Sequence, residues 1–281
     1  MGAAGCRSAD RLMDKARHFH TLHRAGRPLL LPNAWDAGSA ALFAGMDFAA
    51  IATTSGGLAW SLGHADGEQL PLRELLAAVR RIVRVVDVPV TVDFEAGFGT
   101  TPAQVGESVR ALLDTGAVGL NLEDGIAHAS LRSLDDAAAR IAAARSAAEG
   151  VGIPAFINAR VDGWIVGGMT ADALFEDGVR RARAYLDAGA DGIYPIALAE
   201  PATIGEFCAA VAAPVNIGAR PGLPDLAALG RLGVARVSTA TRLAMLALSA
   251  ARDAAQAMRD TGGFDVLASG VSYDDVQQWF D

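Results

Sequence analysis

A unit that repeats along most of the chain is the feature that most constrains its fold. Each copy has a short aliphatic or β-branched run, a loop rich in Gly, Asp, Asn or Ser, and then a helical stretch rich in Ala, Leu and Arg. The runs cover residues 29–32, 48–53, 89–93, 118–123, 155–160, 192–195, 214–217 and 234–238. Eight such alternations within 281 residues are typical of a closed (β/α)₈ barrel. We therefore predict an α/β fold of the TIM barrel type.

An open, doubly wound parallel sheet is the alternative, because eight units also suit that fold. The first run is not followed by a G-x-G-x-x-G loop, which weakens this alternative. We expect an amino-terminal tail and helix at 1–28, the catalytic barrel at 29–260 and a helical carboxy-terminal extension at 261–281. Trp279 and Phe280 in the extension predict that it docks on a partner subunit or on its own barrel.

The composition excludes several classes of partner. The formal charge is −8, from 24 Lys and Arg and 32 Asp and Glu, so we expect no basic surface that binds nucleic acid or an anionic membrane. The chain has no run of 18 or more apolar residues, and its start lacks an apolar signal segment. We therefore expect a cytoplasmic protein that acts on a small molecule.

Rare residue types restrict the chemistry further. Lys15 is the only lysine and lies in the amino-terminal helical stretch, which argues against a Schiff-base mechanism. Cys6 and Cys208 have no metal-binding spacing, so we expect neither a disulfide nor thiol catalysis. The same helical stretch carries His18, His20 and His23. Their spacing does not place them on one helical face, which favours a solvated face over a metal site.

The sequence PVTVDFEAGFG, residues 89–99, carries two carboxylates to the end of a predicted strand. Asp93 and Glu95 are two residues apart, so in an extended chain their side chains point to the same side. In a barrel the carboxyl ends of all strands meet at one mouth. We therefore expect the loop acids Asp66 and Glu123 to join this pair.

Four carboxylates at one mouth would repel one another. A like-charged pair about 4 Å apart costs on the order of 4 kcal/mol at an effective dielectric constant of about 20. Oxygen ligands without clustered His or Cys suit a hard cation, so we predict that these four bind Mg²⁺, or alternatively Mn²⁺, largely through water. Asp36 and Asp124 are expected to cap helices instead.

Arg160 lies at the end of the fifth run and is expected to face the acids. A metal ion beside an arginine suits a substrate with a 2-oxo-carboxylate group, because the metal polarises the carbonyl while the arginine and the backbone amides of residues 54–57 bind carboxylates. We therefore predict an enolpyruvate-like intermediate. A structural ion pair between Arg160 and a neighbouring acid is the alternative.

Six stretches together resemble the isocitrate lyase / phosphoenolpyruvate mutase superfamily. They are NAWDAGSA (33–40), TTSGGLAWSLGHADG (53–67), VDFEAGFG (92–99), GLNLEDG (119–125), INARVD (157–162) and AGADGIYP (188–195). They occur in the order and with the spacing of the family, across nearly all eight units, which makes the set specific.

The resemblance implies a (β/α)₈ barrel whose last helix is often swapped between the subunits of a dimer or tetramer. It implies that Asp93 binds Mg²⁺ directly, while the other three acids act mainly through water. It also implies that Thr54, Ser55 and Gly56 hold the pyruvyl part of a substrate and that Arg160 faces the rest.

The loop after Glu123 departs from the family pattern. Lyases carry there a Lys-(Lys/Arg)-Cys-Gly-His type of sequence whose cysteine acts as the acid, and phosphoenolpyruvate mutases carry a lysine. This chain has DGIAHASLRS at 124–133, and Trp35 stands where many lyases have tyrosine. His128 or His64 is then the candidate acid, with a solvated loop histidine as the alternative in each case.

The favoured function is a Mg²⁺-dependent carbon–carbon lyase or decarboxylase of a small 2-oxo or 2-hydroxy acid. One alternative is a phosphorus–carbon enzyme of the phosphonopyruvate or phosphoenolpyruvate type, with Arg220 of the stretch GARPG (218–222) as a candidate anion ligand, although loop packing explains that stretch better. Another is a 2-oxo acid binding protein without turnover. The predicted catalytic residues are Arg160, Glu123 and His128. The predicted substrate-binding residues are Trp35, Thr54, Ser55, Gly56, Asp93, Arg160 and Asn216.

Overall fold

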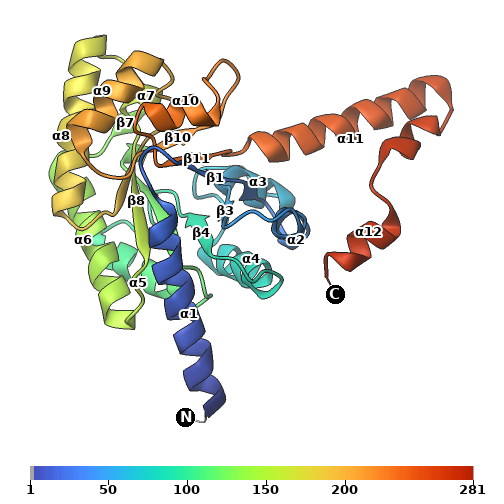
Figure 1. Cartoon of the computed structure of the whole chain (residues 1–281), viewed down its shortest axis with the longest axis horizontal. Helices are drawn as coiled ribbons and strands as arrows, with labels where there is room; N and C mark the ends of the chain where they lie inside the picture. Colours follow the sequence, from blue (N-terminus) through green and yellow to red (C-terminus); the bar gives the residue numbers. More distant parts are fainter. Residues whose placement is uncertain (1–2, 281) are drawn as a thin grey trace.

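The parallel strands of the chain form one barrel (Figure 1). The computed structural model describes residues 3–280, with side chains from residue 10 onward. Among these residues, eight strand positions follow one another: β1 (Leu29–Leu31) with β2 (Asn33–Ala34), β3 (Ile51–Thr53), β4 (Val90–Asp93), β5 (Gly119–Glu123), β8 (Phe156–Val161), β9 (Gly192–Pro195), β10 (Asn216–Gly218) and β11 (Arg236–Ser238). Each predicted run overlaps one of these positions.

The barrel closes through its first strand. β1 pairs with β11, whereas β2, just beyond it in the chain, pairs with β3. From β3 the parallel order continues through β4, β5, β8 and β9, and a bridge between Ile193 and Val215 joins β9 to β10, which pairs with β11. The predicted (β/α)₈ barrel is confirmed. The open doubly wound sheet is wrong, because such a sheet would not pair its first strand with its last.

Helices surround the strands, and several of them begin at side chains that accept hydrogen bonds from their first turn. They are α2 (Ala37–Gly45), α3 (Ser55–Ser61), α4 (Leu72–Arg84), α5 (Pro102–Leu113), α6 (Leu134–Val151), α7 (Gly163–Val166), α8 (Ala171–Asp187), α9 (Pro201–Val211) and α10 (Leu226–Arg231). Asp36 accepts from the N–H of Ser39 and caps α2, as predicted. Cys208 is a free, half-buried thiol on α9, and the side chain of Cys6 lies outside the described residues.

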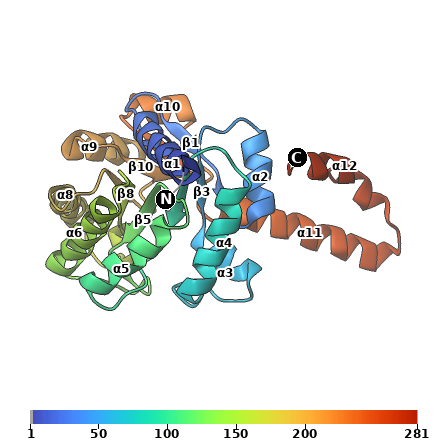
Figure 2. The ribbon, with the colours of Figure 1, turned by 90° about the horizontal axis from the view of Figure 1, so that it is seen from below.

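The carboxy-terminal half of helix α1 (Ala3–Leu22) packs against the barrel, and its amino-terminal half projects beyond it (Figures 1 and 2). Phe19 is fully buried, and His23 stacks on Phe156 with ring centroids 3.9 Å apart. Nδ1 of His23 donates to the carbonyl oxygen of Phe19 (2.8 Å). The predicted solvated face is wrong for His23, because its ring is buried against Phe19 and Phe156. His18 is exposed, as predicted.

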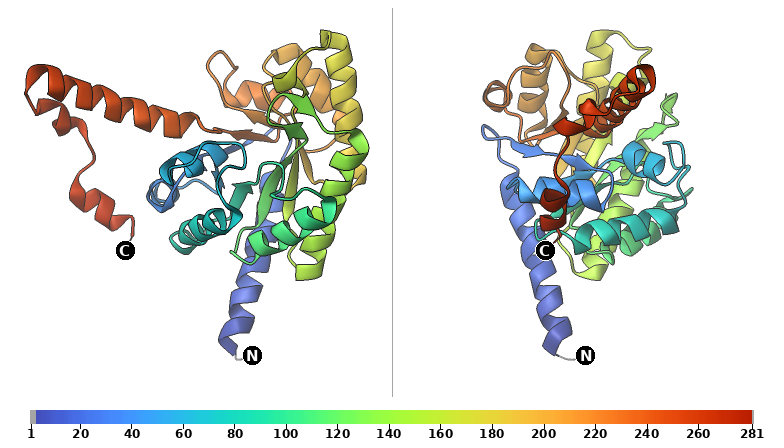
Figure 3. Two further views of the ribbon diagram at one scale, coloured as in Figure 1. Left: turned by 180° about the vertical axis from the view of Figure 1, so that it is seen from behind. Right: turned by 90° about the vertical axis from the view of Figure 1, so that its right-hand side faces the viewer.

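The long helix α11 (Arg242–Thr261) stands away from the barrel (Figures 1 and 3). Of its twenty residues, all of which are described, Ala244 alone is buried, while Leu246 is 64% exposed. The chain then turns back through η1 (Asp265–Ser269) and α12 (Tyr273–Gln278), and Trp279 comes near Gly45 of α2 in the same chain. Within the described residues, no helix is long and apolar enough to span a membrane.

Burial of His23 makes the stability of the fold depend on pH. Desolvation, followed by the charge of Arg236, lowers the pKa of His23 from 6.5 to about 3. The unfolded chain therefore binds the proton more readily between these values, and stability falls as the pH drops below 6.5. From pH 6 to pH 5, wild type should lose about 1 kcal/mol more than His23→Phe, measured by chemical unfolding. A His18→Phe control should follow the wild type; equal slopes for wild type and His23→Phe would contradict this expectation.

Candidate functional site

Strand register brings the polar residues to the carboxyl end of the barrel in layers. Asp93 of β4 pairs with Asn121 of β5, and two residues further on Glu123 of β5 pairs with Arg160 of β8. Residues that are paired in parallel strands point to the same side of the sheet. Asn121 also accepts a hydrogen bond from Arg236 of β11 (3.4 Å), which is not a neighbouring strand. These side chains therefore lie inside the barrel.

Asp93 is held by groups from two neighbouring strands. Its Oδ2 accepts from the N–H of Ser55 (3.3 Å) and its Oδ1 from the side-chain amide of Asn121 (3.3 Å). Its own N–H donates to the hydroxyl of Thr53 (3.1 Å). The amide of Ser55, which was expected to bind substrate, thus orients the proposed metal ligand.

Glu95 lies in a loop with a strained backbone. Glu68, Glu95 and Phe98 have φ angles of 55°, 47° and 51°, a region that residues other than glycine seldom adopt. The N–H of Glu68 donates to Oε2 of Glu95 (2.6 Å), and the N–H of Phe98 donates to Oε1 of Glu68 (2.7 Å). Burial, followed by the charge of Asp93, raises the pKa of Glu95 to about 8. Contacts that hold strained residues in place are common at functional sites.

Arg160 joins Glu123 to Asp162. Its Nη2 lies 2.5 Å from Oε2 of Glu123, and its Nε and Nη2 donate to the two oxygens of Asp162, both at 2.7 Å. Burial opposes the ionisation of Asp162, but hydrogen bonds and charge from Arg160 outweigh it and lower the pKa of Asp162. Burial raises the pKa of Glu123 against the attraction of Arg160. The ion pair considered as an alternative for Arg160 is therefore present, and substrate binding by this residue stays a prediction.

His128 lies beside this cluster and His64 does not. His128 is in the turn of a hairpin formed by β6 (Gly125–Ile126) and β7 (Ser130–Leu131), and its Nδ1 is 3.7 Å from Oδ2 of Asp162. The nearby carboxylate of Asp162 raises the pKa of His128. His64 instead lies 3.6 Å from Glu74 of α4.

One group of potential metal ligands is found within the described residues. It consists of Glu123, His128 and Asp162, whose ligand atoms all lie within 4.8 Å of one another. Arg160 already pairs with both carboxylates of this group, so a cation bound by all three would compete with the guanidinium.

Two more predicted residues frame the loop at the start of α3. Thr54 caps this helix, and Asp66 packs over Gly56 so closely that a Cβ there would lie 3.0 Å from its Oδ2. Only glycine fits this position without a shift of the carboxylate. The predicted metal ligand Asp66 and the predicted substrate loop are thus in contact.

Trp35 and Asn216 are engaged by their own neighbours. The ring of Trp35 packs edge-on against Phe43, with centroids 6.2 Å apart. The amide of Asn216 and the hydroxyl of Ser238 exchange hydrogen bonds of 3.1 and 3.2 Å at a buried position. Contact of either residue with substrate stays a prediction.

The sequence interpretation missed Arg236, a buried arginine inside the barrel next to the candidate site. Arg236 is 1% exposed inside the barrel, and within the described residues its Nε and Nη1 have no hydrogen-bond partner. Burial lowers its pKa to about 10. The local sequence ARVST gave no signal for a buried charge, because an arginine at the start of a short strand is usually exposed.

Asp124 does not cap a helix as predicted; it is buried, and it accepts from the N–H of Asp162 (2.8 Å).

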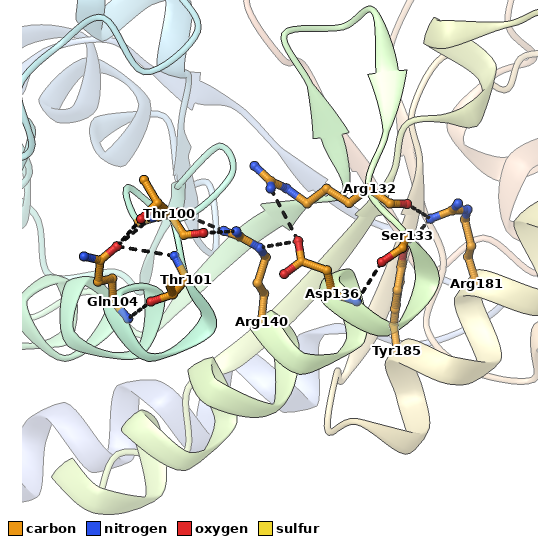
Figure 4. Close-up of polar contacts among 10 residues, drawn as sticks. Thr100, Thr101, Gln104, Arg132, Ser133, Asp136, Arg140, Arg181 and Tyr185 are labelled. Carbon is orange, nitrogen blue, oxygen red and sulfur yellow. Dashed lines mark hydrogen bonds and ion pairs between the residues drawn. The ribbon is translucent and has the colours of Figure 1, made fainter.

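Buried arginines also hold the loops of the mouth from the outside (Figure 4). Arg140 of α6 donates to the carbonyl oxygens of Gly99 and Thr100, both at 2.9 Å, and its Nε donates to Asp136 (3.0 Å). Asp136 also accepts from Arg132 at the end of the hairpin (3.4 Å). Helix α6 thus ties the loop after β4 to the hairpin after β5.

The donor set fits a hard divalent cation. All four predicted ligands are carboxylates, and burial together with their mutual repulsion raises the pKa of Glu95 and of Glu123. A bound cation would remove that repulsion. Among the described residues the four do not bring three ligand atoms within 4.8 Å of one another.

Metal binding should therefore release protons near neutral pH. Because the pKa of Glu95 is about 8, this carboxyl is largely protonated at pH 7 and must ionise when a cation binds. Affinity for Mg²⁺ should rise by up to about tenfold per pH unit between pH 6 and pH 8. Calorimetry in two buffers of different ionisation enthalpy measures the released protons. Glu95→Gln should release fewer, and an identical release would assign the proton elsewhere.

Known proteins of this fold share the same sequence features. A family model described as phosphoenolpyruvate phosphomutase matches residues 19–259. An uncharacterised protein of Mycobacterium tuberculosis is 36% identical over 261 residues, which cover 92% of this chain and 94% of that one. An oxaloacetate decarboxylase of Rhodopseudomonas palustris is 32% identical over 228 residues, with coverage of 76% and 75%.

Solved structures agree with these matches. The crystal structure of a putative lyase/mutase from Burkholderia cenocepacia superimposes with a TM-score of 0.89 at 37% identity, covering 96% of this chain and 97% of that one. A phosphonopyruvate hydrolase in complex with oxalate and Mg²⁺ has a TM-score of 0.81 at 25% identity, with coverage of 94% for each chain. The chain belongs to the isocitrate lyase / phosphoenolpyruvate mutase superfamily.

Proposed function

We propose that this protein is a Mg²⁺-dependent decarboxylase or carbon–carbon lyase of a small 2-oxo acid, with oxaloacetate as the first candidate. The observation that carries the proposal is the buried fork of Arg160, set between Glu123 and Asp162 in the layer above Asp93. The guanidinium of Arg160 can bind a substrate carboxylate, and the acids beside it are suited to a metal ion. The likeness to an oxaloacetate decarboxylase supports the same reaction class.

Asp93 would bind Mg²⁺ directly, with Glu95, Glu123 and Asp66 holding its waters, and the ion would act as a Lewis acid on the 2-oxo group. Mn²⁺ could take the same place. The chain's own contribution is to hold these carboxylates apart and oriented. The bonds from Ser55 and Asn121 to Asp93 serve this purpose.

A substrate carboxylate would bind to Arg160. Asp162 and Glu123 engage its Nε and Nη2, so Nη1 is the nitrogen with which this guanidinium would contact a ligand. The carboxylate of Asp162, 3.7 Å away, raises the pKa of His128, so this histidine is protonated more readily than a free one. It would return a proton to the carbon from which carbon dioxide has left.

Decarboxylation suits this mouth better than cleavage with an acid on the leaving group. When carbon dioxide leaves, the electron pair of the broken bond stays on the carbon next to the carbonyl, and the departing group needs no proton. The hairpin offers His128 in place of the lyase cysteine or mutase lysine. The phosphorus–carbon alternative is weaker, because Arg220 donates to the carbonyl of Ala197 on the surface.

Product analysis tests this function. Proton and phosphorus NMR with oxaloacetate, isocitrate, methylisocitrate and phosphonopyruvate should show pyruvate from oxaloacetate, faster than with Mg²⁺ alone and suppressed by EDTA. Asp93→Asn should weaken oxalate binding by about 100-fold, because a metal ligand is lost. The control Asp191→Asn removes a charge at the opposite end of the barrel and should leave oxalate affinity unchanged.

The other outcomes separate the alternatives. Unchanged oxalate affinity in Asp93→Asn would exclude this residue as the metal ligand. Phosphate released from phosphonopyruvate would assign the phosphorus–carbon class. Tight oxalate binding without any product would identify a binding protein.

We also propose that a second copy of the chain covers α11, in a homodimer or homotetramer. Met245, Leu246 and Leu248 of this helix are 51%, 64% and 58% exposed, which is unusual for adjacent apolar residues. Leu30, on β1, is also 39% exposed, so the barrel wall has an uncovered apolar position. A helix from a second copy would cover apolar surface of this kind.

Association through α11 should depend on its apolar residues. Leu246→Glu should shift sedimentation equilibrium toward the monomer, because a buried charge in the interface would be unpaired. Gln256→Glu on the same helix adds the same charge at a polar, exposed position and should leave the assembly unchanged. A wild type that sediments as a monomer at micromolar concentration would refute this proposal.

A further inference from the structure

The guanidinium of Arg160 is fixed by a carboxylate that is itself fixed. Asp162 is fully buried and accepts from both Nε and Nη2 of Arg160 at 2.7 Å. Its carboxylate also packs against Gly125, where a Cβ would lie 2.5 Å from Oδ2. The N–H of Asp162 donates to Oδ1 of Asp124 (2.8 Å). The orientation of Arg160 therefore depends on where Asp124 places the backbone of Asp162.

Helix α8, in the outer layer, holds Asp124. Tyr185 donates its hydroxyl hydrogen to Oδ2 of Asp124 (2.5 Å), and Nη1 of Arg181 donates to the same oxygen (3.1 Å). Both helix side chains are buried, and Nη1 of Arg181 also donates to the carbonyl of Arg132 at the end of the hairpin (3.2 Å; Figure 4). The other guanidinium edge of Arg181 bonds to Asp177 (2.7 Å).

Two roles are consistent with a satisfied, buried carboxylate. One is structural, since a buried charge needs donors wherever it lies. The other is positional, and it is favoured by how Asp124 divides its two oxygens. Oδ2 takes both donors from α8, whereas Oδ1 takes the backbone of Asp162. A rigid helix outside the barrel is thereby connected to the residue that orients Arg160.

We propose that Tyr185 and Asp124 are positioning residues that act through Asp162 to aim Arg160 at the carboxylate of the substrate. The substrate side of this inference rests on the proposed function. The series of hydrogen bonds that leads from Tyr185 through Asp124 and Asp162 to Arg160 does not depend on it. In a pocket that binds a carboxylate by one guanidinium edge, a small displacement of that edge lowers affinity for the anion without changing affinity for the metal.

The test compares Tyr185→Phe with a matched control. Tyr185→Phe removes a single hydroxyl, and Thr115→Val removes another buried hydroxyl, which bonds to the carbonyl of Leu112 on α5 (2.6 Å). Titration calorimetry should show oxalate affinity, at saturating Mg²⁺, reduced about three- to tenfold in Tyr185→Phe and unchanged in Thr115→Val. Mn²⁺ affinity, followed by electron paramagnetic resonance, should change less than about twofold in both.

A double-mutant cycle shows whether the effect passes through Arg160. In an Arg160→Lys background the two-nitrogen fork to Asp162 is absent, so adding Tyr185→Phe should cause no further loss of oxalate affinity. An equal loss in both backgrounds would overturn the proposal. A Tyr185→Phe variant that is less stable than wild type but binds oxalate like wild type would also overturn it.

A readout without any ligand keeps this inference separate from the proposed function. The Nε–H signal of Arg160 in nitrogen-15 NMR, assigned by its loss in Arg160→Lys, should exchange with solvent more quickly in Tyr185→Phe than in wild type or Thr115→Val. If wild type binds no oxalate, the proposed function fails. The exchange rate of the Arg160 Nε–H still tests the positioning role in that case. Unchanged exchange in Tyr185→Phe would refute that role.

Discussion

One arginine is shared by two carboxylates at the mouth of this barrel. Arg160 is buried between Glu123 and Asp162, and it is the cation that pairs with the acids on these two strand ends. Removing it would leave two buried carboxylates without compensation, which is far more costly than losing a surface pair. Arg160 is shared by Glu123 and Asp162. Within the described residues, no basic side chain is bonded to Asp93 or Glu95. A bound cation would supply the positive charge that these two carboxylates lack.

The barrel itself could be predicted from the sequence because its signals are local. A buried strand is a run of apolar residues, and a polar loop that follows it can be recognised without knowing its neighbours. This was sufficient to place Asp93, Glu95, Glu123 and Arg160 at one end. The cap at Asp36 was predictable for the same reason, since Asp36 and Ser39 are three residues apart.

Contacts between distant residues could not be predicted in this way. Asp124 and Tyr185 are 61 positions apart, and nothing near Asp124 in the sequence indicates that a helix hydroxyl will reach it. Arg236 and Asn121 meet across the barrel and are 115 positions apart. His23 was assigned to solvent because helical spacing cannot reveal that its ring is buried against Phe156 of β8. In each case the closure of the barrel, not the local pattern, decides the environment.

The projecting helix and the mouth are also in contact. A Cβ at Gly56 would lie 3.2 Å from the side chain of Thr241, and one at Gly57 would lie 3.3 Å from Ala244. The first turn of α11 therefore rests on the loop that is proposed to hold the pyruvyl part of a substrate. A second copy that packs against α11 would therefore influence the position of that loop through Thr241 and Ala244.

The reach of α8 to Asp124 has a consequence for how such barrels can be recombined. Engineers exchange βα units between barrels as if each strand and its following helix were a separate module. Here Asp124 belongs to the unit of β5, whereas Arg181 and Tyr185 belong to the unit of β8. A chimera whose crossover falls between these two units would inherit a buried carboxylate without its donors. The β5 and β8 units must therefore be transferred together. Substitutions at Arg181 and Tyr185 of α8 are restricted by Asp124, which belongs to the other unit.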